Sequence, residues 1–194
     1  MHALMQRHPL GVLVANTSSG LDANHIPFVV DAAPEPWGTL RCHVARANPI
    51  WASLEQNPDV LVIFQGPDGY VSPSVYEAKQ QDGRVVPTWN YVAVHAYGAA
   101  RVVHERTWLL DLLNALTSAH EADRPEPWQV ADAPADYTDK LLRAIVGIEI
   151  KIDKLIGKWK LSQNRSETDR ANIAADLRDQ PHSSNVAMAE LLER

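Results

Sequence analysis

The chain has 194 residues, 45% of them hydrophobic and 22% charged, with a net charge of −6 at pH 7. This composition is typical of a soluble globular domain with enough apolar material for a core. The negative charge argues against a protein that coats DNA through its bulk charge, because duplex affinity comes largely from neutralised phosphates. The single cysteine, Cys42, excludes an internal disulfide and a cysteine-rich metal site. We recognise neither a signal peptide nor an apolar run near 18 residues, so we expect a cytoplasmic protein with no membrane span.

The first half of the chain predicts short β-strands separated by turns. Residues 1–8 read as the middle of an amphipathic helix, so we expect that an earlier segment is missing. Asn, Gly, Pro and Ser clusters mark turns, among them residues 66–69, and a polar loop is expected over 77–83. Strands are expected over residues 10–15, 21–30, 39–45, 59–65, 70–72, 89–94 and 97–103, with a helix over 49–56. Six or seven antiparallel strands of this kind indicate a small barrel or sandwich.

The second half of the chain is mostly helical. Helices are expected over residues 107–121, 136–144, 166–180 and 185–194. Thr107 is a credible N-cap, and Ser166 with Asp169 matches an Asp variant of the capping box. Residues 146–152 alternate isoleucine with charged residues, which predicts a strand with one apolar face. The fold class is therefore α+β and mainly β, with flanking helices and a helical C-terminal part.

Residues 157–165 (GKWKLSQNR) are the most informative stretch of the chain. They place three cations, one flat aromatic ring and three neutral hydrogen-bonding side chains within nine residues. A local excess of donors in an acidic protein predicts an anionic group bound by charge-assisted hydrogen bonds, beside a ring for stacking. Flavin mononucleotide (FMN) has both a phosphate and a planar tricycle. The alternative interpretation is a solvated basic turn.

A second basic cluster follows the strand over residues 39–45. Arg41 and His43 are two residues apart on this strand and therefore point to the same face. Arg46 and Asn48 lie at the entrance of the next helix, where backbone N–H groups favour an anion. The cluster predicts a phosphate site, and its alternative is a pair of arginines in surface salt bridges.

Trp89 and Tyr91 flank Asn90 on another strand and share one of its faces. They could form a stacking wall for a ring, but periodicity alone favours a place in the core. Tyr70 and Tyr76 are similarly ambiguous.

Other chemistry has little support in the sequence. His25, His43 and His95 fall on predicted strands, but no HExxH, paired HxH or carboxylate cluster supports a zinc site, so we expect no metal. GxGxxG, P-loop and GxSxG motifs are not found. Cys42 and His43 are neighbours on a strand and point to opposite faces, so they cannot form a nucleophile–base dyad. We identify no catalytic residue.

Four segments, residues 21–28 (LDANHIPF), 41–49 (RCHVARANP), 86–91 (VPTWNY) and 157–165, together resemble the PaiB family of FMN-binding negative transcriptional regulators. The resemblance runs from about His8 to the end of the chain. Family members commonly begin further upstream, and the chain departs at Cys42, where a glycine is expected, and at Val75, where a tryptophan is expected. The resemblance implies an antiparallel FMN-binding split β-barrel, like that of pyridoxamine-phosphate oxidases and flavin reductases. It places the barrel domain at residues 1–165 and C-terminal helices, packed on the barrel or the dimer partner, at 166–194.

The resemblance also implies a homodimer with each flavin near the subunit interface. Arg41, Arg46 and Asn48 would hold the phosphate, and His43 would lie beside the ribityl chain or the ring. Trp89 and Asn90 would approach the flavin from neighbouring strands. The residues that would close the site, from this subunit or its partner, are Lys158, Trp159, Lys160, Ser162, Gln163 and Asn164.

Two functions remain open at this point. One is a flavin-binding negative regulator whose flavin acts as ligand or redox sensor and whose partner is promoter DNA. The other is a flavin-dependent, or haem-handling, oxidoreductase of the split-barrel class. We recognise no helix-turn-helix with a basic recognition helix, and the helix over 166–180 has balanced charges. An enzyme would not need a protein acid or base, because the cofactor carries the difficult step.

Overall fold

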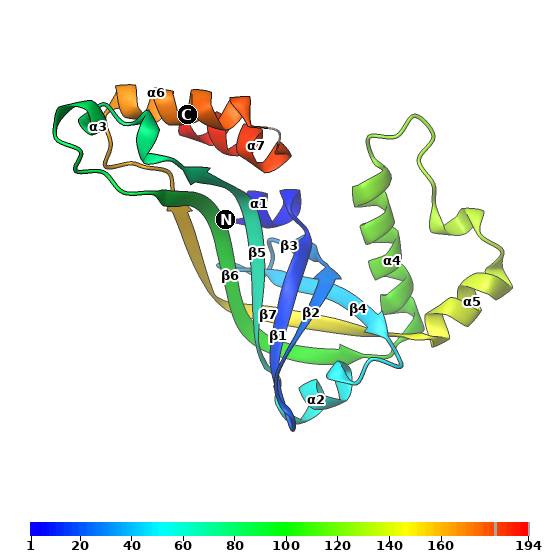
Figure 1. Ribbon diagram of the computed structural model, residues 1–194. Coiled ribbons are helices and arrows are strands. Elements are labelled where there is room, and N and C mark those ends of the chain that lie inside the picture. The colour runs from blue at the N-terminus through cyan, green and yellow to red at the C-terminus, as the bar shows by residue number, and fades with distance from the viewer. Residues whose placement is uncertain (181, 194) are drawn as a thin grey trace. The chain divides into compact units, whose positions relative to one another are not determined.

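The computed structural model describes residues 1–180 and 182–193 (Figure 1). Among the described residues, seven strands form one antiparallel sheet in the order β2-β1-β5-β6-β7-β4-β3. The strands are β1 (Leu10–Thr17), β2 (Gly20–Pro27), β3 (Val29–Asp31), β4 (Thr39–Ala45), β5 (Asp59–Val71), β6 (Thr88–Val103) and β7 (Ile145–Lys160). The α-helices are α1 (His2–Arg7), α2 (Ile50–Gln56), α3 (Ala78–Gln81), α4 (Arg106–Glu121), α5 (Ala135–Arg143), α6 (Glu167–Asp179) and α7 (Ser183–Leu192). Short 3₁₀ turns are η1 (Pro73–Val75) and η2 (Val130–Asp132). The α+β class predicted from the sequence is confirmed.

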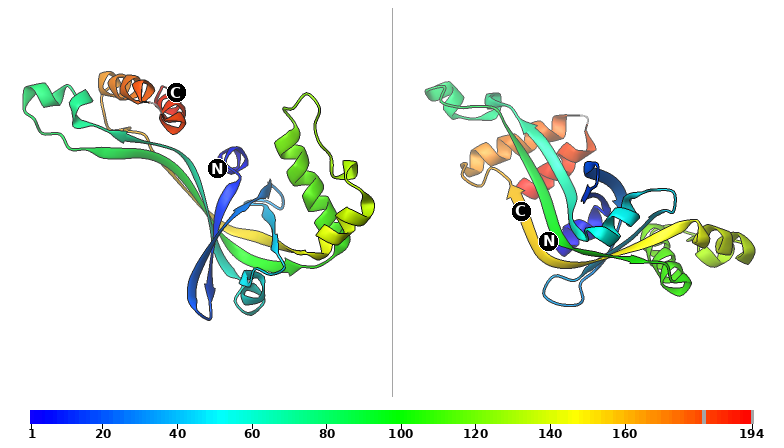
Figure 2. Two further views of the ribbon diagram at one scale, coloured as in Figure 1. Left: turned by 45° about the vertical axis from the view of Figure 1, so that its right-hand side comes forward. Right: turned by 90° about the horizontal axis from the view of Figure 1, so that it is seen from below.

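The chain forms two compact units. Unit 1 consists of Met1–Phe64 and Val94–Ile156, and unit 2 consists of Gln65–Ala93 and Gly157–Arg194. Strands β5, β6 and β7 each give one part to each unit. In unit 2, α6 and α7 lie side by side (Figures 1 and 2). The expected division at residue 165 stays a prediction.

The core of unit 1 follows from alternation along its strands. In β4, Leu40, Cys42 and Val44 are buried, and the residues between them face outward in part. Leu40 pairs with Ile150 of β7, which is also buried. Each such pair removes apolar surface from water on one face of the sheet, which is the main stabilising contribution to a fold of this kind.

The expected single strand over residues 21–30 is divided in the structure. Up to Pro27, the chain pairs with β1 as β2, and from Val29 it pairs with β4 as β3. Between them, the N–H of Phe28 donates to the carbonyl of Pro9 at 2.9 Å. The segment therefore changes its partner, which a pattern of apolar residues does not reveal.

The expected turn over residues 66–69 is wrong, because β5 continues through it. Gly69 packs against α6, where an added Cβ would lie 2.7 Å from Leu177 Cδ2. The Ser184 hydroxyl of α7 accepts the Asp68 N–H at 2.9 Å and donates to the Asp68 carbonyl at 3.0 Å. The absence of a side chain at Gly69 allows α6 to pack closely on β5. Ser184 forms the hydrogen bonds to the Asp68 backbone that a neighbouring strand would form in a wider sheet.

The two strands expected over 89–94 and 97–103 are one strand, β6, and the strand expected over 146–152 extends to Lys160 as β7. Gly98 makes this close pairing possible, since a Cβ there would lie 2.0 Å from the Lys151 carbonyl oxygen. We call residues 157–165 the basic segment. Its first four residues, 157–160, therefore belong to a strand. The polar loop expected over residues 77–83 contains the short helix α3.

Helix starts are partly as predicted. Ser166 caps α6, and its hydroxyl accepts the Asp169 N–H at 3.0 Å. The reciprocal half of the capping box is wrong, because the Asp169 carboxylate accepts the N–H of Glu77 at 3.0 Å instead. The expected cap of α4 at Thr107 is also wrong, because the N-cap is Glu105.

Candidate functional site

In unit 1, the predicted phosphate ligand Arg41 is held in an ion pair. Its Nε donates to Asp31 Oδ2 at 2.6 Å and its Nη2 to Asp31 Oδ1 at 3.4 Å. The pairing of β3 with β4 brings the two residues together, and the Arg41 side chain is only 20% exposed. A phosphate at this position would share the guanidinium with a carboxylate, which lowers the net charge available to it.

Arg46 is exposed and joins the end of α5 to the start of β7. Its Nε donates to the carbonyl of Arg143 at 2.8 Å, and its Nη2 donates to that of Ile145 at 2.9 Å. These two bonds use two of the five N–H groups of the guanidinium. The remaining donors can bind an anion while the backbone bonds fix the side chain.

Asn48 is engaged through both ends of its side chain. Its Oδ1 accepts the N–H of Ile50 at 3.0 Å, so this N–H at the entrance of α2 is not free for an anion. Its Nδ2 donates to Asn24 Oδ1 at 2.7 Å. Sequence reasoning did not assign a role to Asn24, although Asn24 lies in the segment 21–28 that carries the family resemblance. The structure adds it to the surroundings of the predicted phosphate ligands.

His43 lies half-buried on β4, opposite Gly147 of β7. Burial lowers the pKa of its imidazole, which is therefore neutral at pH 7. Its Nδ1 is buried and has no hydrogen-bond partner among the described residues. Buried polar atoms are normally hydrogen-bonded, so this unpaired nitrogen is an exception among the described residues.

In unit 2, the basic segment is an ordered structure and not a loosely solvated turn. Gln163 fixes it through both ends of its amide: Nε2 donates to the Trp159 carbonyl at 2.6 Å, and Oε1 accepts the Leu161 N–H at 3.0 Å. Lys160 Nζ donates to Thr88 Oγ1 at 2.6 Å. Trp159 is half-buried, whereas Lys158 and Asn164 are exposed. The segment therefore presents the Lys158 charge on a fixed backbone.

Ser162 of this segment forms a buried polar pair with Asn90 of β6. The Ser162 hydroxyl donates to Asn90 Oδ1 at 3.0 Å, and Ser162 is 7% exposed. Ser162 has a φ of 54°, in the left-handed region that non-glycine residues rarely adopt. Asn90 Nδ2 is buried without a partner among the described residues. Backbone strain and an unsatisfied donor at one place are typical of a binding site.

The expectation that Trp89 and Tyr91 lie in the core is wrong. Trp89 is 55% exposed and Tyr91 36% exposed, while Asn90 between them is fully buried. Trp89 meets Tyr70 edge-to-face with ring centroids 5.7 Å apart. Tyr76 is instead buried, with the Arg165 guanidinium over its ring at 4.3 Å. Trp89 and Tyr70 are therefore exposed rings of unit 2, and their role in stacking on a flavin stays a prediction.

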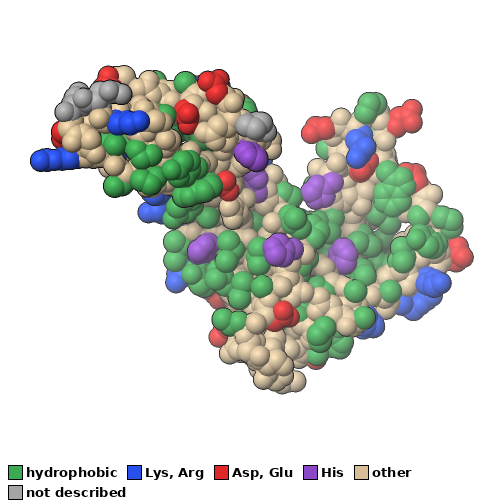
Figure 3. Space-filling model, in the orientation of Figure 1, with side chains coloured by type: hydrophobic (Ala, Val, Ile, Leu, Met, Phe, Trp, Pro, Cys, Tyr) green, Lys and Arg blue, Asp and Glu red, His purple; other side chains and the backbone are tan. Residues whose placement is uncertain are grey.

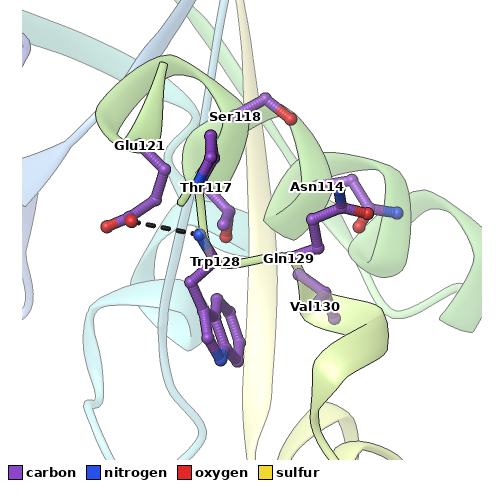
Figure 4. A pocket seen from close by; sticks show the side chains of 8 residues that line it. Asn114, Thr117, Ser118, Glu121, Trp128, Gln129 and Val130 are labelled. Carbon is purple, nitrogen blue, oxygen red and sulfur yellow. Dashed lines mark hydrogen bonds between the residues drawn. The ribbon is translucent and has the colours of Figure 1, made fainter. Parts of the chain in front are cut away.

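Unit 1 also has a hollow of about 430 Å³ beside α4 that sequence reasoning missed (Figure 4). Glu121 holds its loop in place, accepting the Trp128 N–H at 3.2 Å and pairing with Arg124 at 3.0 Å. The helical spacing of its α4 residues is a signal that could have found it. The lining residues are Asn114, Thr117, Ser118, Glu121, Pro127, Trp128, Gln129 and Val130.

The residues that the structure describes bear on metal binding and on membrane crossing. Within that part of the chain, no three His, Cys, Asp or Glu side chains gather in a group able to hold a metal ion. None of the helices there combines the length and the apolar composition that crossing a bilayer requires.

Comparison with known proteins places these features in a family. Residues 1–154 match the family model described as "Putative FMN-binding domain". The protein is 36% identical to an uncharacterised protein of Emericella nidulans, over 99% of this chain and 90% of that protein. It is 34% identical to the protease synthase and sporulation protein PAI 2 of Bacillus subtilis, over 97% of this chain and 88% of that protein.

Among solved structures, the fold is similar to that of the FAD and heme binding protein from Mycobacterium smegmatis. The TM-score is 0.62 and the sequence identity 20%, over 87% of this chain and 74% of that one. This likeness concerns the fold alone. From the family match and the relatives together, the chain belongs to the PaiB family of FMN-binding split-barrel proteins, and FMN is its cofactor.

Proposed function

We propose that the protein is a cytoplasmic negative transcriptional regulator whose bound FMN acts as ligand or redox sensor. The family match supports the flavin. The Bacillus subtilis relative, named protease synthase and sporulation protein PAI 2, supports the regulatory role. The observation that carries the flavin part of the proposal is the exposed ring of Trp89, in the same unit as the exposed Lys158 on its fixed backbone.

In this proposal, residues of unit 1 and residues of unit 2 bind different parts of FMN. In unit 1, Arg46 supplies positive charge for the phosphate, and the neutral His43 supplies a ring nitrogen for an uncharged polar group. In unit 2, Lys158 supplies charge from a fixed backbone, and the exposed ring of Trp89 supplies a surface for stacking. When bound, the flavin itself supplies the redox chemistry.

A homodimer is part of the proposal. The exposed aromatic side chains of unit 2, Tyr70, Trp89 and Tyr91, are the kind of surface that a second subunit and a cofactor cover together. In such a dimer, the basic segment of one subunit closes the site of the other. Promoter DNA is the proposed partner of the dimer, and its contact with a protein of net charge −6 would depend on a local basic patch.

Four measurements on freshly purified protein test the proposal. A visible absorbance spectrum and an FMN titration should show flavin bound with a defined stoichiometry, and native mass spectrometry should show two chains. A gel shift with promoter DNA should be lost as salt is raised and should change when FMN is removed or reduced. Protein without any affinity for FMN would overturn the cofactor assignment for these residues.

The gel shift also separates the two candidate functions. Rapid reduction of bound flavin by NADH or NADPH with multiple turnovers, together with no DNA shift at low salt, would favour the flavin-dependent oxidoreductase over the regulator. A DNA shift that follows the flavin state, without turnover, supports the regulator.

A further inference from the structure

A hollow of about 560 Å³ in unit 1 has a basic lining that the sequence analysis did not bring together. It lies between the start of α4 and the end of α5, and the guanidinium of Arg46 borders it. Basic side chains are exposed over α5 on the face that Figure 3 shows. The lining residues are Arg46, His104, Arg106, Leu109, Asp139, Leu142 and Arg143.

The charges of this lining favour an anion. Its three guanidinium groups and one carboxylate leave two net positive charges, in a protein whose total is −6. Arg106 is paired with Asp139, with Nε 3.1 Å from Oδ1. Across the described part of the chain, no hydrogen bond or ion pair engages the guanidinium of Arg143. Its charge is therefore available to a ligand.

The helix ends at the hollow do not cancel this preference. The start of α4 contributes partial positive charge, and no side chain caps its first N–H groups. The end of α5 contributes partial negative charge, which Arg46 offsets by donating to the Arg143 carbonyl, and Arg46 also donates to the Ile145 carbonyl at the start of β7. Glu55 Oε1 lies 4.0 Å from His104 Nε2, so it offsets that imidazole when the ring is protonated.

The hollow also has an apolar floor. Leu109 and Leu142 line it and are almost fully buried. An inorganic ion gains no free energy from contact with apolar side chains, whereas the carbon chain of a phosphate ester can pack against them. The combination of guanidinium groups and a leucine floor therefore fits a phosphate monoester better than a free anion.

We propose that this hollow binds the phosphate of a phosphate monoester, with Arg143 and Arg106 as specificity-determining ligands beside Arg46. Where the monoester is FMN, the inference rests on the proposed function, which already assigns Arg46 to the flavin phosphate. A different phosphate ester and free phosphate share the same chemistry. The planar guanidinium groups suit a phosphate because each can donate two parallel hydrogen bonds to its oxygens.

The test compares three probes: FMN, riboflavin, which lacks the phosphate, and inorganic phosphate. Each is titrated into wild-type protein and into the Arg143→Ala and Arg106→Ala variants. FMN affinity should fall by roughly 10-fold to 100-fold in Arg143→Ala, the range for a charged hydrogen bond, while riboflavin affinity stays unchanged. Inorganic phosphate should compete with FMN in the wild type and compete less in the variant.

The matched control is Lys140→Ala, which removes one positive charge from an exposed position of the same helix outside the lining. It should leave the ratio of FMN to riboflavin affinity unchanged. Arg143→Gln, which keeps much of the aliphatic side chain, replaces the alanine variant if that variant melts at a lower temperature than the wild type.

The outcomes separate this inference from the proposed function. If FMN binds but Arg143→Ala and Arg106→Ala leave the FMN-to-riboflavin ratio unchanged, the inference is overturned and the flavin function stands. If FMN does not bind but the wild type binds inorganic phosphate and Arg143→Ala does not, the hollow is a phosphate site and the flavin function fails. If neither probe binds, both are overturned.

Discussion

The hydroxyl of Ser162 donates to the side-chain oxygen of Asn90 at 3.0 Å, and Ser162 itself has a left-handed φ of 54°. The two residues are 72 positions apart in sequence and are both buried. This bond ties the end of β7 to β6 within unit 2, and it leaves the amide nitrogen of Asn90 as the group without a partner.

Two substitutions of Ser162 measure separately how the hydrogen bond and the left-handed backbone conformation affect the free energy of unfolding. Ser162→Ala keeps the strained φ and leaves Asn90 Oδ1 without its donor, so the free energy of unfolding should fall by about 1–3 kcal/mol. Ser162→Gly loses the same bond but relieves the strain, so its loss should be smaller by about 1 kcal/mol. Urea unfolding of the two variants measures the difference, and equal losses would show that the backbone is not strained.

The hydroxyl of Ser184 should contribute to the stability of unit 2. Ser184→Ala removes both hydrogen bonds to the backbone of Asp68, and we expect a loss of about 1–2 kcal/mol in the free energy of unfolding. The amide of Asp68 should also exchange with solvent faster. The control is Ser183→Ala, which changes an exposed serine at the first position of the same helix. Equal effects of the two changes would contradict the proposed contact.

The two lysines of the basic segment should bind the cofactor without holding the fold together. Lys158→Ala combined with Lys160→Ala should lower FMN affinity, because it removes two positive charges near the proposed phosphate or ring. Melting of the flavin-free protein should shift little, since Lys158 is exposed and the Lys160 bond goes to the small hydroxyl of Thr88. Lys79→Ala plus Arg84→Ala removes two exposed charges from unit 2 as a control. A large drop in melting temperature without flavin would show that the lysines are structural.

Stability should depend on pH through His43. Burial lowers its pKa below the unfolded value of 6.5, so between those two values the unfolded state binds more protons than the folded state. The free energy of unfolding should therefore fall as pH drops below about 6.5. His43→Gln should reduce this slope. The pKa of His8 is also lowered by burial, so part of the slope should remain in the variant. Unfolding at a series of pH values measures the slope of the free energy of unfolding against pH. An unchanged slope in His43→Gln would show that His43 does not cause the pH dependence.

Cys42 should be unreactive in the folded protein. It is fully buried on β4, and burial raises the pKa of its thiol, so the reactive thiolate is scarce. Iodoacetamide should label it at the rate of unfolding, and denaturant should make labelling fast. Because the chain contains one cysteine, the mass increase reports this site alone. Rapid labelling under native conditions would contradict the burial of Cys42.

The sequence predicted strands best where apolar and polar residues alternate and no turn residue interrupts. The strand over 39–45 agrees with the structure at both ends. The prediction failed at residues 66–69, because glycine and proline signal a turn locally, whereas helix packing on Gly69 keeps the chain extended. Tertiary contacts from residues more than 100 positions away decided that segment.

Some features of the candidate site could also be predicted from the sequence, and others could not. Residue types alone indicated an anion and a ring, and the family resemblance named the cofactor. The pairing of Arg41 with Asp31 could not be predicted, because a loop separates them and only the adjacency of β3 and β4 brings them together. The exposure of Trp89 was also unpredictable, since alternation shows which residues share a face but not which face is buried.

The contact between Ser184 and Asp68 has a consequence for how the protein is kept apart from its neighbours in a crowded cell. Without α7, the N–H and carbonyl of Asp68 would lie open to a strand from another molecule, and open strand backbone is a template for fibrous aggregates. The C-terminal helix therefore covers strand backbone of Asp68 that would otherwise be open to pairing, in addition to packing on β5.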